Sequence, residues 1–128
     1  MIVDSSAVLA ILLNEPDAGR YEEAITRARY CRMSAANFLE AALVLEGRAG
    51  EERGGDLDRF LESTGVELEP VTVEQARRAR EAWRRYGKGN HPAGLNFGDC
   101  FAYALADATR EPLLFKGEDF ALTDIDPA

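Results

Sequence analysis

Four acidic residues stand where their carboxylates could act together: Asp4, Glu40, Asp99 and Asp119. Asp4 ends an apolar stretch at the start of the sequence, and Asp119 follows a second apolar stretch near its end. Glu40 lies among apolar residues in a helical pattern, with Asn37 about one turn before it. Because a buried carboxylate without a partner is costly, Glu40 is expected either to meet a cation, a metal or solvent in a cleft, or to belong to a narrow solvated stripe.

The other acids also have structural interpretations. Asp4 precedes a helix, whose dipole favours a negative charge at that end. Asp99 stands three residues after Asn96, where an acid commonly accepts a hydrogen bond from the amide of the capping residue. Its neighbours are apolar and follow a glycine-rich loop, which favours a place at the mouth of a cleft. Asp119 lies in an acidic turn, where the adjacent Glu118 could serve equally well.

Carboxylate oxygens favour the hard cations Mg²⁺ and Mn²⁺, and Mg²⁺ often takes only one or two carboxylates with water and substrate phosphate. The single histidine, His91, excludes a histidine-rich zinc site, and the lack of a G-x-S-x-G motif argues against a Ser-His-Asp hydrolase. A P-loop and a G-x-G-x-x-G motif are also absent. Metal-assisted phosphodiester cleavage fits best, because a metal lowers the pKa of its bound water and offsets phosphate charge.

The charge of the chain is unevenly distributed. The net charge is −8, which opposes nucleic-acid binding by the overall field. Six of the 15 basic residues nevertheless lie between Arg77 and Lys88, against one acid. Basic side chains here either solvate a surface helix or offset phosphate charge, and the candidates for phosphate contact are Arg84, Arg85, Lys88 and Lys116. Trp83 and Tyr86 can stack on bases, although their helical spacing favours core or dimer contacts.

The remaining pattern describes the elements that position these residues. At 128 residues, 46% of them hydrophobic, the chain is expected to form a single domain, residues 1–128. Strands are predicted at 1–4, 30–33 and 112–115 and at 66–70, where Val66 and Leu68 alternate with glutamates. Because helical patterns separate these strands, we expect an α/β fold with a parallel sheet covered on both faces and residues 1–4 near its centre. The site of such a sheet lies beyond the carboxyl ends of its strands.

Helix starts are indicated by capping residues. Ser34, Thr72 and Asn96 are predicted to cap helices that end near residues 48, 86 and 110. Three further helices are expected at 5–14, 16–29 and 56–64. The first of these would be capped by Ser5 or Ser6, and the last would follow a glycine-rich break.

Four segments of the chain resemble one known family. They are Met1–Ala7, Ser34 with Asn37 and Glu40, Leu95–Ala102, and Leu113–Phe120. Together and in this order they resemble PIN-domain ribonucleases, and more narrowly the VapC toxins of type II toxin–antitoxin pairs. The resemblance implies a three-layer α/β/α fold with a parallel sheet, an acidic Mg²⁺ or Mn²⁺ site and cleavage of RNA. It also implies a homodimer and a cognate VapB-like antitoxin that inhibits the toxin.

The family's functional residues can be carried over individually. Its three main acids match Asp4, Glu40 and Asp99. Its fourth acid matches Asp119, with Glu118 adjacent. Ser6 matches a small hydroxyl residue that steadies the first aspartate, and Asn37 falls where a polar neighbour of the site is often found.

Two other functions compete with this interpretation. One is a PIN-like module that binds nucleic acid or a partner with little catalysis, which an assay of Mn²⁺-dependent RNA digestion would distinguish. The other is a haloacid-dehalogenase-type phosphatase. That chemistry needs a second aspartate two residues after Asp4, where this chain has Ser6.

An antitoxin also has physical support in the residues. An acidic site rimmed by bases suits an inserted Arg or Lys that pairs with the carboxylates and displaces the metal. A groove for an amphipathic antitoxin helix is expected from apolar residues of the early helices, among them Leu12, Leu13, Phe38 and Leu45. Cys31 and Cys100 form no C-x-x-C pair and are expected to be free core thiols, and no apolar run could span a bilayer, so a cytoplasmic protein is expected.

Overall fold

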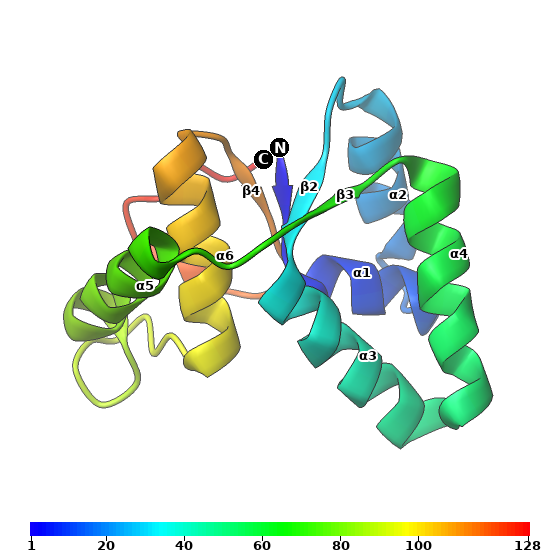
Figure 1. Ribbon diagram of the computed structural model, residues 1–128, viewed down its shortest axis with the longest axis horizontal. Coiled ribbons are helices and arrows are strands. Elements are labelled where there is room, and N and C mark those ends of the chain that lie inside the picture. The colour runs from blue at the N-terminus through cyan, green and yellow to red at the C-terminus, as the bar shows by residue number, and fades with distance from the viewer.

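Four short parallel strands form the centre of the computed structural model, which describes residues 1–128. They are β1 (Ile2–Val3), β2 (Arg32–Ser34), β3 (Glu67–Glu69) and β4 (Leu113–Leu114). The order across the sheet is β3-β2-β1-β4, so β1 lies inside the sheet, as predicted. Because all three pairings are parallel, the carboxyl ends of the strands point to one edge of the sheet (Figure 1).

Six helices cover the two faces of this sheet (Figure 1). They are α1 (Ser5–Leu12), α2 (Ala18–Arg27), α3 (Ala35–Ala49), α4 (Gly54–Thr64), α5 (Val73–Tyr86) and α6 (Phe97–Thr109). Two 3₁₀ turns, Glu51–Arg53 and Phe120–Leu122, complete the regular structure. In Figure 1, α5 and α6 lie to the left of the sheet and α1 to α4 lie to the right. The predicted α/β/α fold with a central parallel sheet is confirmed.

Successive strand residues divide the core in two. Ile2 and Leu113 are fully buried and belong to a cluster with residues of α5 and α6. Val3 and Leu114, the next residues of the same strands, belong to a second cluster with residues of α1 to α4. Since side chains alternate between the faces of a strand, two residues in each strand are enough to fasten helices on both sides of the sheet.

Three predicted helix starts are confirmed by their caps. The hydroxyls of Ser34 and Thr72 accept hydrogen bonds from amides in the first turns of α3 and α5. The side chain of Asn96 does the same for α6. These side chains satisfy amides that have no partner inside the helix. They fix where α3 and α6 begin, and therefore where Glu40 and Asp99 lie.

Two predicted boundaries are wrong. Helix α1 is capped by Asp4, whose side chain accepts from the Ser6 amide, and not by Ser5 or Ser6. Helix α4 begins at Gly54 and not at residue 56, directly after a 3₁₀ turn. The glycine-rich stretch is therefore part of the helical structure and not a loop. A Cβ at Gly54 would lie 2.9 Å from Oε1 of Glu46. The glycine therefore lets the start of α4 pack closely against the end of α3, a tertiary contact that overrides the low helix propensity.

The groove expected on the early helices is corrected at one residue, Leu45. Leu45 is fully buried in the core, and the other three residues proposed for the groove are partly buried against the same cluster. Leu45 therefore cannot line a groove, whereas Leu12, Leu13 and Phe38 keep part of their surface exposed, so a groove at these three residues stays a prediction. The exposed apolar side chains of α3 are instead Leu39 and Leu43, which are 56% and 64% exposed.

Both cysteines are buried and unpaired, as predicted. Burial raises the pKa of the Cys31 thiol, and it raises the pKa of the Cys100 thiol to about 11. Neither residue is therefore a reactive thiolate at neutral pH. No helix combines the length and the apolar character needed to cross a membrane.

Candidate active site

Asp4 lies directly after β1, where it is 2% exposed. Its Oδ2 accepts hydrogen bonds from the amide and the hydroxyl of Ser6, at 3.0 and 2.6 Å. Its Oδ1 is buried and has no hydrogen-bond partner. Burial raises the pKa of Asp4 to about 6, and the nearby charge of Glu40 adds to this effect against the opposing Ser6 bonds. The surroundings of Asp4 thus lack positive charge.

Ser6 connects Asp4 to the loop after β4. Its hydroxyl donates to Asp4 and accepts from the backbone amide of Lys116, 2.9 Å away. A hydroxyl can donate one hydrogen bond and accept others, so one orientation serves both partners. Ser6 thereby fixes Oδ2 of Asp4 and leaves Oδ1 available to another group.

Glu40 reaches the same region from α3. Its Oε1 accepts from the hydroxyl of Ser5 at 2.5 Å and from Nδ2 of Asn37 at 3.4 Å. Asn37 is fully buried, and its Nδ2 also donates to the carbonyl oxygen of Gly98 at 2.9 Å. Glu40 is half-buried, and two neutral donors hold one of its oxygens. Asn37 therefore links the Glu40 side chain to the first turn of α6.

Helix α6 approaches the Glu40 carboxylate closely at Gly98. A Cβ at Gly98 would lie 1.8 Å from Oε2 of Glu40, well inside van der Waals contact. Ser5 and Gly98 are the two residues at this site that sequence reasoning did not identify. The only signal for them in the sequence is that each is adjacent to a predicted acid, Asp4 or Asp99.

Asp99 takes part in a helix cap and in the acidic cluster. Its Oδ2 accepts from the Asn96 amide at 3.0 Å, while its own amide donates to Oδ1 of Asn96 at 2.9 Å. This capping box confirms the structural interpretation of Asp99. Burial nevertheless raises the pKa of Asp99 to about 7, and repulsion from Asp4, Asp119 and Glu40 contributes. The two interpretations considered for this acid are therefore compatible.

Asp119 lies at the exposed rim of the cluster, immediately before the 3₁₀ turn Phe120–Leu122. Its side chain makes no capping hydrogen bond. Its charge is among those that raise the pKa of Asp99, which favours Asp119 over the adjacent Glu118 as the fourth acid.

The donors at this site fit a hard divalent cation. The two buried side-chain oxygens without hydrogen-bond partners, Oδ1 of Asp4 and Oδ1 of Asn37, are both acceptors. The raised pKa values of Asp4 and Asp99 indicate a region that favours added positive charge. The structure has no group of three histidine, cysteine, aspartate or glutamate side chains arranged to hold one ion. Carboxylate and amide oxygens are the donors that hard cations prefer, and Mg²⁺ often takes only one or two carboxylates and keeps several waters.

The four basic residues considered for phosphate contact lie in different settings. Arg84 and Arg85 are each paired with an acid, at 2.5 and 3.3 Å. Lys116 pairs with two acids near the start of α2, at 2.6 and 2.8 Å. Lys88 is exposed and forms no ion pair, so its ammonium group is free to contact a phosphate.

The PIN domain family matches residues 1–126 of the chain. The chain belongs to this family. A VapC ribonuclease of Mycobacterium bovis is 53% identical over 125 residues, which cover 98% of this chain and 95% of the relative. A ribonuclease VapC of Mycolicibacterium smegmatis is also 53% identical, over 98% of this chain and 97% of the relative. The resemblance to VapC-type PIN domains is thus confirmed along almost the whole chain.

Solved structures share the fold of this PIN domain. VapC20 of Mycobacterium tuberculosis, described as a toxin that cleaves the sarcin-ricin loop, superposes with a TM-score of 0.81 over 99% of this chain and 97% of its own. A toxin–antitoxin complex from Klebsiella pneumoniae superposes with a TM-score of 0.71 over 96% of this chain and 92% of the matched chain. Both are 18% identical to this chain, so they support the three-layer fold.

Proposed function

We propose that this PIN domain is a metal-dependent endoribonuclease and the toxin of a type II toxin–antitoxin pair. In this proposal it cleaves RNA at the acidic site with Mg²⁺ or Mn²⁺, acts as a homodimer and is inhibited by a cognate VapB-like antitoxin. The 53% identity to curated VapC ribonucleases supports the activity. The toxin–antitoxin complex among the matched folds supports the kind of partner.

The observation that carries the proposal is that acids from distant parts of the chain gather at one site beside the carboxyl ends of the strands. Asp4 follows β1, Glu40 lies in α3 and Asp99 lies in the first turn of α6. Their charges, with that of Asp119, raise the pKa of Asp99. A fold gains no stability by gathering like charges away from water. A function that needs a bound cation at the acidic site explains why these acids lie together.

Each residue of the site has a distinct task in this proposal. Asp4 would hold the cation through its free Oδ1, and Asp99 and Glu40 would hold it directly or through water. A bound Mg²⁺ or Mn²⁺ would activate a water and offset charge on the scissile phosphate. Ser6 fixes the orientation of Asp4, and Asn37 fixes that of Glu40 against α6.

The test is digestion of single-stranded RNA by the purified protein in EDTA, in Mg²⁺ and in Mn²⁺. Cleavage is expected only with a divalent cation, and Asp99→Asn is expected to lower its rate by several orders of magnitude. Asp58→Asn is the matched control, because Asp58 is an exposed acid of α4 that forms no ion pair. Cleavage in EDTA, or normal cleavage by Asp99→Asn in Mg²⁺, would contradict the proposal.

Inhibition by an antitoxin is tested separately, by co-purification with the product of the neighbouring reading frame. We expect a stable complex that cleaves RNA far more slowly than the free protein, because an inserted Arg or Lys pairs with the carboxylates. A complex that cleaves as fast as the free protein would rule out inhibition at the acidic site. Sedimentation of the free protein tests the homodimer.

A further inference from the structure

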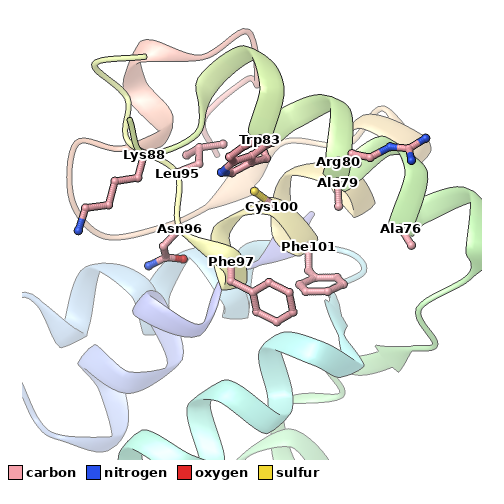
Figure 2. Close-up of a pocket in the computed structure, with 10 residues that line it drawn as sticks. All are labelled: Ala76, Ala79, Arg80, Trp83, Lys88, Leu95, Asn96, Phe97, Cys100 and Phe101. Carbon is pink, nitrogen blue, oxygen red and sulfur yellow. The ribbon is translucent and has the colours of Figure 1, made fainter. Parts of the chain in front are cut away.

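A pocket of about 600 Å³ opens between α5 and α6, beside the first turn of α6 (Figure 2). Seven of its ten lining residues are hydrophobic, and its size is typical of pockets that bind small ligands. Two of its aromatic side chains are unusually exposed, Trp83 at 48% and Phe97 at 81%. The Phe97 ring packs edge-on against Phe101, with 4.9 Å between ring centroids. Exposed aromatic rings gathered at a pocket indicate a binding surface.

Trp83 is held in place from one side. Its carbonyl oxygen accepts hydrogen bonds from the amide of Gly87 at 2.8 Å and from Nδ2 of Asn90 at 3.0 Å. A Cβ at Gly87 would lie 2.4 Å from Cδ1 of the indole, so only glycine allows the ring to rest against the backbone there. The indole is thus supported by the chain and still half exposed, as a platform for stacking requires.

The charge of the pocket favours an anionic ligand. Its only charged lining residues are Arg80 and Lys88, which are exposed and form no ion pair. Of the other arginines of α5, Arg78, Arg84 and Arg85 are paired with acids, whereas Arg77 is exposed and forms no ion pair. In a chain of net charge −8, two unpaired cations beside an aromatic pocket suit a ligand with a flat apolar part and a negative backbone. A nucleotide of single-stranded RNA has both.

The pocket adjoins the acidic site through Asn96. This residue lines the pocket and forms the capping box with Asp99, at 2.9 and 3.0 Å. Its Oδ1 is occupied by the Asp99 amide, which leaves the exposed Nδ2 free to donate to a base edge. An RNA strand with one phosphate at the acids can therefore place a neighbouring base in the pocket.

We infer that this pocket is a base-binding subsite, in which an unpaired base of the RNA stacks on Trp83 while Arg80 and Lys88 contact the flanking phosphates. The inference rests on the proposed ribonuclease function and adds to it a place where sequence is recognised. A protein partner could also bury Trp83 and Phe97. Such a partner would not explain why two unpaired cations, Arg80 and Lys88, line the same pocket.

Trp83 is the only tryptophan of the chain, so its fluorescence reports on this pocket directly. The protein is titrated with four single-stranded RNA hexanucleotides, each built from only one of the four bases. The titrations contain EDTA, which prevents metal-dependent cleavage. We expect saturable quenching that differs among the four bases, and no quenching by inorganic polyphosphate, which carries the charge without bases. Unchanged Trp83 emission while the anisotropy of a labelled RNA reports binding would overturn the inference, and so would equal quenching by polyphosphate.

Substitution separates base stacking from a structural role. Trp83→Ala is expected to weaken RNA binding by roughly 5- to 150-fold, the range for loss of one stacked base, whereas Trp83→Phe keeps most of it. Tyr30→Ala is the matched control, because Tyr30 is an aromatic residue of similar exposure, 45%, that does not line the pocket. Circular dichroism of each variant verifies that it is folded.

Two outcomes with the Trp83→Ala variant would overturn the inference. One is RNA binding and a cleavage pattern that match those of the unmodified protein. The other is unchanged RNA binding with a smaller sedimenting species, which would assign the pocket to a protein interface. Failure of the proposed function is distinguishable from both, because the unmodified protein would then show no metal-dependent cleavage at all.

Discussion

Asp4 and Asp99 keep their protons at pH values where an ordinary carboxyl group has lost them. Burial is the main cause for both residues, and the negative charges around them add to it. In the absence of a cation, the folded protein therefore binds protons more tightly at these two places than the unfolded chain does. A cation at the site would compete with those protons.

The first prediction concerns the pH dependence of stability in EDTA. The folded-state pKa values, about 6 for Asp4 and about 7 for Asp99, lie above the ordinary value of 3.8. The stability that the protonated Asp4 and Asp99 give to the folded protein is therefore fully present below about pH 4. It is lost as the pH rises through 6 and 7. Because a tenfold change in proton affinity corresponds to about 1.4 kcal/mol, urea unfolding should show a stability a few kcal/mol higher at pH 5 than at pH 8. A stability that rises from pH 5 to pH 8 would contradict this prediction.

The second prediction follows from the same charges. Asp4→Asn removes one of four repelling carboxylates, so the free energy of unfolding in EDTA at pH 8 should stay the same or increase. Mg²⁺ should raise the melting temperature of the unmodified protein, since a ligand of the folded state stabilises it, and should do so much less in Asp4→Asn. Asp58→Asn should respond to Mg²⁺ like the unmodified protein. An equal Mg²⁺ response in Asp4→Asn would remove Asp4 from the cation site.

At the scale of elements, the start of α6 holds the site together. Asn96 and Asp99 form its cap, Gly98 admits Glu40, and Asn37 of α3 donates to the Gly98 carbonyl. The first turn of one helix thus determines where two of the acids lie. A change in the spacing between α3 and α6 would affect both.

A third prediction tests that spacing. Gly98→Ala places a Cβ 1.8 Å from Oε2 of Glu40, so the Glu40 carboxylate must leave its hydrogen bonds with Ser5 and Asn37 or α6 must shift. We expect a destabilisation of about 1–3 kcal/mol, typical of overpacking, and a large loss of metal-dependent cleavage. Gly47→Ala is the matched control: Gly47 lies inside α3 with no atom within 4 Å of an added Cβ. It should stabilise the protein by about 0.5–1 kcal/mol. Thermal and urea unfolding measure both, and a Gly98→Ala protein as stable and active as the Gly47→Ala protein would contradict the prediction.

Local signals explain what could be predicted of these elements from sequence. Ser34, Thr72 and Asn96 identify the starts of α3, α5 and α6, because a cap is a contact within a few residues of chain. The order of short apolar strands and helices was enough to predict the parallel sheet. The start of α4 could not be predicted, since it depends on Gly54 packing against Glu46 of a neighbouring helix.

The same distinction applies to the candidate site. Its acids were identified from their positions after strands or among apolar residues. The contacts of Ser5 with Glu40 and of Asn37 with Gly98 join residues 35 and 61 positions apart in the chain. No local pattern encodes such contacts. The roles of these residues in catalysis remain predictions for the experiments above.

At the scale of the whole molecule, the proposed binding of RNA by this acidic protein depends on cations that are not already paired with acids. The fourth prediction is that Arg80→Ala with Lys88→Ala weakens RNA binding and lowers the slope of log affinity against log salt by about 1.4, since each phosphate contact to a single strand contributes about 0.7. The double variant Arg84→Ala with Arg85→Ala should lower this slope less, because both arginines already form ion pairs with acids. Binding titrations over a series of salt concentrations measure both slopes. Equal slopes in the two double variants would show that ion pairing on α5 does not decide which cations meet RNA.

The pairing of β1 with β4 has a consequence for the order of events during synthesis. Asp4 is made long before Lys116, yet the Ser6 hydroxyl that orients Asp4 accepts from the Lys116 amide, 110 positions later in the chain, and Asp119 follows Lys116. A nascent chain therefore lacks a finished acidic cluster until the segment with Lys116 and Asp119 has been translated and can pack against β1. Under the proposed function, a chain that has not yet made Lys116 and Asp119 therefore lacks the complete site at which RNA would be cleaved.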